Sequence, residues 1–182
     1  MKFITEFGRY ILMLKGMFSK PENKKVYWKE FMHQCNDIGI GSLGIVVIIS
    51  VFMGAVSTLQ TAYQLVSPVI PKSSIAQIVR DTVLLEFAPT LVCIVLAGVV
   101  GSKIASELGN MRVSEQIDAL EIMGINTKTY LVMPKILAAM LVIPMLVVIS
   151  AALGIWGGRV AGQAAQILST TDFDKGLLQS FL

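Results

Sequence analysis

AGVVGSKIASELGNMRVSEQIDALEIMGINTKTYLVMPK, residues 97–135, begins and ends inside long apolar runs but holds a short polar segment in its middle. That segment carries the signals of one brief helix, with Ser114 as N-cap, residues 115–123 as body and Gly124 as left-handed stop. We therefore expect two membrane spans separated by a small helical insert that can contact a partner outside the bilayer.

The composition predicts an all-α integral membrane protein. Of the 182 residues, 54% are hydrophobic and 15% are charged, and the mean hydropathy is +0.71, which excludes an ordinary soluble domain. A net charge of +3 gives no indication of nucleic acid binding. Cys35 and Cys93 lack the spacing of metal ligands and are interpreted as packing residues. The N-terminus lacks the pattern of a cleaved signal peptide, so we expect it to be retained.

Residues 1–37 read as an amphipathic segment preceding a transmembrane domain over 38–182. Apolar residues recur at helical spacing from Phe3 to Phe18, which predicts a helix in the headgroup plane or, as an alternative, one packed on protein. A turn over 19–25 and a second short amphipathic piece over 26–37 follow. The lone His33 has no evident partner and is interpreted as a solvated side chain.

Three apolar runs predict three spans, over residues 38–59, 87–102 and 136–156. Only 16 uncharged residues separate Glu86 from Lys103, and a helix of that length covers about 24 Å of a core about 30 Å thick. Glu86 therefore lies near the hydrocarbon as a functional acid, or it caps a helix that starts near Pro89. In the third span Pro144 should introduce a kink.

Glycines, alanines and one charged pair in the second and third spans lead to three further predictions. Glycines of the run GIWGG, residues 154–158, should loosen the end of the third span. Lys103 and Glu107 should form a pair one helical turn apart. A strip at four-residue spacing permits close approach of another helix, and it comprises Ala97, Gly101, Ala105 and Gly109.

The predicted insert helix has two strips of side chains. Acids recur every three residues at Glu115, Asp118 and Glu121, beside the apolar strip of Ile117, Leu120 and Met123. A helix of nine residues does not persist alone in water, so it needs a surface to pack on. Docking to a partner and packing on the chain's own cytoplasmic face both remain open.

Basic residues set the orientation. Lys and Arg number seven before the first span, two before the second, four before the third and two after it. This alternation places the N-terminus and the insert in the cytoplasm, and the loop around Pro68 and the C-terminal end outside. The sequence contains no phosphate-binding loop, metal-ligand cluster or paired nucleophile and base, so we expect no catalytic residue, no metal and no bound cofactor.

Residues 107–135 resemble the signature of the MlaE/YrbE family, the permease subunits of Mce-type ABC transporters for phospholipids and other lipids. Residues 41–60, 85–109 and 154–158 also match, in order. The resemblance implies a homodimer in the bacterial inner membrane, a cytoplasmic ATPase that binds ATP and Mg²⁺, a periplasmic Mce-domain protein and membrane phospholipids. Family members continue for two more spans beyond the matched region, so we expect this chain to be a fragment.

The resemblance also implies roles for particular residues. Residues 115–124 are similar to the coupling helix that inserts into the ATPase. Glu86 and Pro89 correspond to the family's acidic motif near the lipid cavity, with Leu85 in place of its arginine, and Gln60 and Tyr63 are further candidates for that cavity.

The implied function is phospholipid movement between inner membrane and periplasm that maintains outer-membrane lipid asymmetry. Alternatives are a Mce-type permease for another hydrophobic substrate such as a sterol or solvent, a membrane scaffold without bound lipid, and a membrane enzyme using Glu86 and Asp81.

Overall fold

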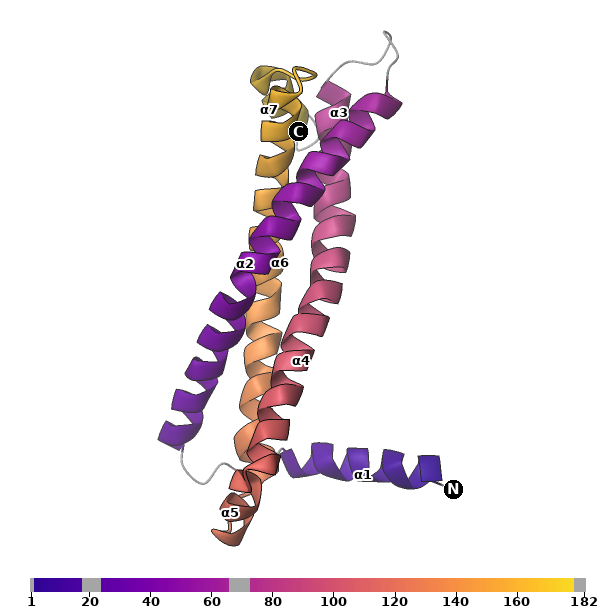
Figure 1. Ribbon diagram of the computed structural model, residues 1–182. Coiled ribbons are helices and arrows are strands. Elements are labelled where there is room, and N and C mark those ends of the chain that lie inside the picture. Colours follow the sequence, from indigo (N-terminus) through magenta and orange to yellow (C-terminus); the bar gives the residue numbers. More distant parts are fainter. Residues whose placement is uncertain (1, 18–23, 66–72, 179–182) are drawn as a thin grey trace. The chain divides into compact units, whose positions relative to one another are not determined.

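The described part of the chain is built of helices (Figure 1). The computed structural model describes residues 2–17, 24–65 and 73–178, which contain no β-strand. In order the elements are α1 (Lys2–Met17), α2 (Lys24–Gln64), α3 (Ser73–Thr82), η1 (Val83–Leu91), α4 (Val92–Val113), α5 (Gln116–Ile122), η2 (Lys128–Val132), α6 (Met133–Ala164) and α7 (Thr170–Leu178).

The all-α membrane prediction is confirmed. Three continuous helical stretches are long and apolar enough to cross a bilayer, namely Lys24–Gln64, Ser73–Val113 and Lys128–Ala164. Pro144 lies inside α6, and its kink stays a prediction. Most of the turn expected over 19–25, the loop around Pro68 and the last residues of the chain lie outside the described residues.

Two of the predicted segments run on into longer helices, while the bounds of the spans themselves stay predictions. The amphipathic piece over 26–37 and the first span form one helix, α2, since no proline interrupts it. Likewise α3, η1 and α4 follow one another without a break, although Pro89 lies inside η1. The segment η1 has π-helical pairing, a wider register that is often found at functional sites.

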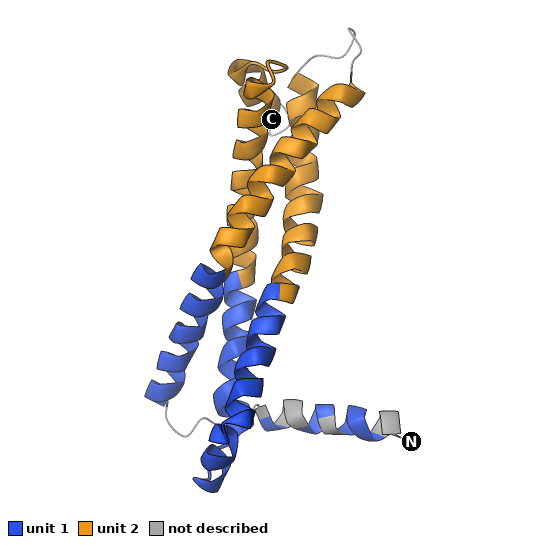
Figure 2. Cartoon of the chain, in the orientation of Figure 1, with its two compact units in different colours: residues 1–41, 99–142 blue, residues 42–98, 143–182 orange. Residues whose placement is uncertain are grey.

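The described residues form two compact units, shown in Figure 2. Unit 1 comprises Met1–Gly41 and Val99–Val142, and unit 2 comprises Ser42–Gly98 and Ile143–Leu182. In unit 1, α1 runs crosswise to the neighbouring end of α4 (Figure 1). The carbonyl oxygen of Gly16, near the end of α1, accepts hydrogen bonds from Thr129 Oγ1 at 3.1 Å and Asn126 Nδ2 at 3.4 Å. The end of α1 is thereby attached to the segment that enters α6.

Unit 2 is held by a hydrophobic cluster in which α3 and α7 pack together. Phe173 of α7 is 1% exposed, and it joins Val79 and Val83 at the centre of a group that also includes Ala62, Ile75, Ala76 and Leu168. Close contact between α3 and α7 depends on Gly176, where an added Cβ would lie 2.3 Å from the carbonyl oxygen of Ser73. The side chain of Arg80 donates to the carbonyl oxygen of Leu177 at 2.8 Å, which adds a polar tie at the same junction.

The glycines expected to loosen the third span instead pack α6 tightly on α2 within unit 2. An added Cβ on Gly157 would lie 2.5 Å from the carbonyl oxygen of Val51, and one on Gly158 would lie 2.5 Å from Thr58 Oγ1. That prediction is wrong because each glycine faces a neighbouring backbone or hydroxyl. Small residues allow such close helix contacts in membranes, where apolar burial alone gives little attraction.

Candidate functional site

The insert helix α5 is shorter than predicted and starts differently. Ser114 does not cap it, because its hydroxyl donates to the Asn110 carbonyl oxygen of α4 at 2.7 Å. Glu115 occupies the N-cap position instead, with a φ of 58° and no capping hydrogen bond from its side chain. A left-handed residue at this point turns the chain sharply between α4 and α5.

The C-terminal end of α5 agrees with the prediction. Gly124 has a φ of 80°, which a residue without a Cβ adopts without strain. Its N–H donates to the Glu121 carbonyl oxygen at 3.0 Å, and the Ile125 N–H donates to that of Leu120 at 3.1 Å. These two bonds are the Schellman pattern, which satisfies carbonyl groups left open at a helix end.

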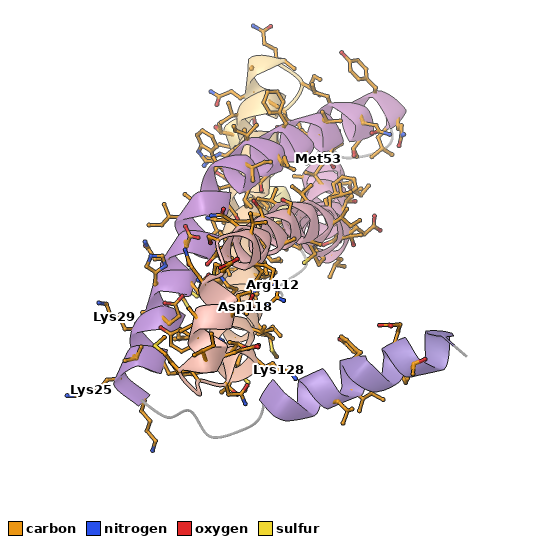
Figure 3. All side chains as sticks on the ribbon, turned by 60° about the horizontal axis from the view of Figure 1, so that its bottom comes forward. Lys25, Lys29, Met53, Arg112, Asp118 and Lys128 are labelled. Carbon is orange, nitrogen blue, oxygen red and sulfur yellow. The ribbon has the colours of Figure 1, made fainter. Side chains whose placement is uncertain are left out.

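Two side-chain bonds hold α5 against its flanks. Arg112 at the end of α4 forms an ion pair with Asp118 (Figure 3). Thr127 Oγ1 donates to Glu121 Oε1 at 3.2 Å. Both bonds are exposed, so each contributes little to stability, but together they restrain α5 from both sides.

The outward apolar surface of α5 differs from the strip proposed from spacing. Ile117 and Leu120 are half-buried against the chain, whereas Val113, Ile122 and Met123 are 85%, 88% and 65% exposed. No residue of α5 itself is buried. Val113 was missed because it lies before the turn at Glu115, and Ile122 because it does not share the three-residue spacing of the predicted strip. We call Val113, Ile122 and Met123 the α5 apolar surface.

Ion pairs tie three helical segments together near α5. Lys103 Nζ of α4 lies 2.7 Å from Asp37 Oδ1 of α2, and Lys135 Nζ of α6 lies 2.5 Å from Glu107 Oε2 of α4. The pair predicted between Lys103 and Glu107 within α4 is therefore wrong, since each side chain pairs with another helix. An interhelical partner was not visible from local spacing.

Glu86 lies in η1 as an exposed side chain. The capping interpretation is wrong, because α3, η1 and α4 are continuous and no helix starts near Pro89. Among the described residues Glu86 has no hydrogen-bond or ion-pair partner. Neighbouring Leu85 is 75% exposed. The result is a carboxylate without a local protein partner on an apolar helix face.

Apart from Pro89, which is half-buried in η1, the other residues proposed for the lipid cavity or for helix packing are also exposed. Gln60 is exposed and Tyr63 is 73% exposed. Ala97, Gly101, Ala105 and Gly109 are exposed, and an added Cβ on Gly101 or Gly109 would meet open space. Their use as a packing surface stays a prediction.

One pocket of unit 2 lies beside η1. It has a volume of about 10 Å³, enough for about one water molecule and too small for an acyl chain. Its wall includes Met53, labelled in Figure 3, together with Phe87 and Ser150. The hydroxyl of Ser150 donates to the Val147 carbonyl oxygen at 2.7 Å, so it is satisfied within its own helix. Nothing in the described residues gathers three or more metal-binding side chains.

Comparisons with known proteins converge on one family. The family model described as Permease MlaE matches residues 31–182. A protein of Rickettsia bellii named "Probable ABC transporter permease protein" is 39% identical over 161 residues, covering 88% of this chain and 62% of the relative. The "Intermembrane phospholipid transport system permease protein MlaE" of Haemophilus influenzae is 30% identical over 161 residues, covering 88% and 61%.

A plant protein also matches. Chloroplastic "Protein TRIGALACTOSYLDIACYLGLYCEROL 1" of Arabidopsis thaliana is 30% identical over 145 residues, covering 80% of this chain and 41% of the relative. The chain spans about three fifths of the length of its bacterial relatives named above.

Proposed function

We propose, because the chain belongs to the MlaE permease family, that it is the membrane-spanning subunit of an ABC transporter for phospholipids. In this proposal a separate cytoplasmic ATPase binds and hydrolyses ATP, and this chain converts the motion of that ATPase into lipid movement. The observation that carries it is the α5 apolar surface, which is exposed on and directly beside a restrained helix between two candidate spans.

The contact with the ATPase is proposed to centre on Ile122 and Met123. Large exposed apolar side chains rimmed by charges are typical of a protein interface, and Glu115 and Glu121 supply such charges on the same short helix. Because α5 is held by Arg112 and Thr127, docking would cost little ordering of the loop.

The lipid path is proposed to pass Glu86, with Pro89, Gln60 and Tyr63 as further contacts. An acid near the hydrocarbon is costly unless it faces a polar group or an aqueous cavity. Glu86 has no such partner among the described residues, so a lipid headgroup or cavity water is proposed to supply it.

Assembly and location follow as proposals from the same family. The subunit is a homodimer in the bacterial inner membrane with its N-terminus in the cytoplasm, and a Mce-domain protein completes it in the periplasm. Its transport maintains outer-membrane lipid asymmetry. A different lipid is the second candidate, because a plant relative is named after a galactosyl lipid.

The docking proposal is tested by co-purification. The chain is co-expressed with the ATPase encoded by a neighbouring gene, and the ATPase retained by tagged permease is measured for the wild type, Ile122→Arg and Met123→Arg. Burying an isoleucine side chain contributes roughly 1.5–3 kcal/mol, so Ile122→Arg should lower the retained ATPase by at least about tenfold. These positions are preferred to Leu120, whose half-buried side chain also supports the fold.

Val26→Arg is the matched control, because Val26 is an exposed apolar residue at the start of α2. It should retain ATPase at the wild-type level. Equal retention by Ile122→Arg and Val26→Arg would remove the docking claim. Lipid specificity is measured separately, by mass spectrometry of lipids that remain bound to the purified complex. Retained phospholipid supports the transporter, whereas a complex without lipid favours a scaffold.

A further inference from the structure

Two ion pairs meet on one face of α4 in unit 1. Lys103 and Glu107 are four residues apart, so their side chains lie one above the other on the helix surface. Lys103 reaches Asp37 of α2, to which its Nζ also donates at the backbone carbonyl oxygen at 3.2 Å. Glu107 reaches Lys135 of α6. Within this unit α4 is therefore linked to α2 and to α6.

The two pairs differ in burial. Side chains of Lys103 and Asp37 are 41% and 37% exposed, so water screens that pair. The Lys135 side chain is only 3% exposed, against 38% for Glu107. Among the described residues Glu107 is the only acid within ion-pair distance of Lys135, and beyond this charge contact the buried Lys135 Nζ has no hydrogen-bond partner there. Separating α6 from α4 here would leave a buried ammonium group uncompensated, which is strongly unfavourable.

The buried pair joins the two ends of the segment that contains α5. Glu107 lies five residues before Arg112, the partner of Asp118 in α5. Lys135 lies in the first turn of α6, directly after η2. Because this ion pair links α4 to α6, a displacement of α5 should move both spans. One span cannot then follow α5 while the other stays in place.

We propose that Lys135 is a positioning residue for transport. Its ion pair with Glu107 makes the end of α4 and the start of α6 respond together when the ATPase moves α5. This inference rests on the proposed function, and it assigns transmission to the pair while leaving docking to the α5 apolar surface. Loss of the pair should separate ATP hydrolysis from lipid movement.

The test uses the complete transporter with its ATPase, reconstituted in phosphatidylglycerol vesicles that contain a fluorescent phosphatidylethanolamine. Lys135→Met and Glu107→Gln each remove one charge, and the double variant Glu107→Lys with Lys135→Glu reverses the pair. Lys128→Met is the control, because Lys128 is an exposed lysine at the start of η2, seven residues before Lys135. Retained ATPase, ATP hydrolysis and lipid moved per ATP are measured for each.

Both single variants should retain ATPase and hydrolyse ATP within about twofold of wild type, while lipid moved per ATP falls about tenfold, within the range of typical coupling energies. The reversed pair should recover most of the loss, and Lys128→Met should match the wild type. Where a single variant fails to insert in the membrane, the neutral double variant Glu107→Gln with Lys135→Met replaces it and should show the same uncoupling.

Three results would overturn the inference: unchanged lipid movement per ATP in Lys135→Met, loss of the ATPase from that variant, or a reversed pair no better than the single variants. Failure of the proposed function is recognised separately, because the wild-type complex itself would then show no ATP-dependent lipid movement.

Discussion

Gly54 and Gly154 place α2 and α6 in backbone contact within unit 2: a Cβ added to Gly54 would lie 1.8 Å from the carbonyl oxygen of Gly154. No side-chain rotation relieves such an overlap, because the obstructing atom belongs to the main chain. The Gly54 carbonyl oxygen also accepts a hydrogen bond from Thr58 Oγ1 at 3.0 Å, which satisfies this buried hydroxyl within α2.

Gly54→Ala should therefore destabilise the protein, although alanine is the better helix former. Forcing the two helices apart should cost roughly 1–3 kcal/mol, as overpacking does in other tightly packed interiors. The midpoint of thermal unfolding in detergent measures it. Gly44→Ala in the same helix is the control, since an added Cβ there meets nothing within 4 Å, and it should be neutral or slightly stabilising. Equal midpoints for the two variants would contradict the close contact.

Phe173→Ala should weaken the junction of α3 and α7. Phe173 is 1% exposed at the centre of the unit 2 cluster, and removal of a buried phenyl ring typically costs about 3–5 kcal/mol. Limited proteolysis should then cut α7 faster, and the unfolding midpoint should fall. Leu178→Ala serves as the control because that side chain, on the same helix, is 66% exposed. A midpoint equal to that of the control would show that the cluster does not hold the junction.

Glu86→Gln should lower lipid movement without lowering stability. The carboxylate has no described protein partner to lose, whereas a charged hydrogen bond to a headgroup contributes about 1.5–3 kcal/mol, equivalent to roughly tenfold or more in transport. Reconstituted complexes with equal amounts of ATPase provide the measurement. Thr90→Ala is the control, one turn further along the helix and also exposed. Wild-type transport by Glu86→Gln would show that the charge is not needed.

Cysteine labelling tests the orientation set by the basic residues. In a background with Cys35→Ser and Cys93→Ala, Lys128→Cys should react with a membrane-impermeant maleimide in inverted inner-membrane vesicles. Gln64→Cys, at the exposed end of α2, should stay unlabelled there and react from the periplasmic side. The reverse pattern would place α5 on the side away from ATP and would remove the transporter proposal.

Local features of the chain were predictable because each depends on a few neighbouring residues. Apolar run length indicated three spans, and Gly124 alone could supply the left-handed residue after α5. Ser114 illustrates the limit. The same residue can begin one helix or end another, and here its hydroxyl bonds to Asn110 in the preceding helix.

The sequence pattern also did not predict that the helix continues across Pro89. A proline in a helical run usually indicates a break, but π-helical pairing carries the backbone past it in η1. The capping role expected for Glu86 required a helix to start near Pro89, so it does not apply in a continuous helix.

The sequence by itself determined the three spans, the proposed orientation and the existence of α5. Each of these depends on a single segment: the length of an apolar run, the number of basic residues beside it, or one glycine after a helix. Which side chains pair with each other depends on two segments at once, so only the tertiary structure decided it. Lys103 and Glu107 pair with other helices rather than with each other because those helices bring Asp37 and Lys135 within reach. The same reason applies to the close packing at Gly54 and Gly154. The absence of a side chain allows close contact only where the fold brings a second helix backbone next to the glycine.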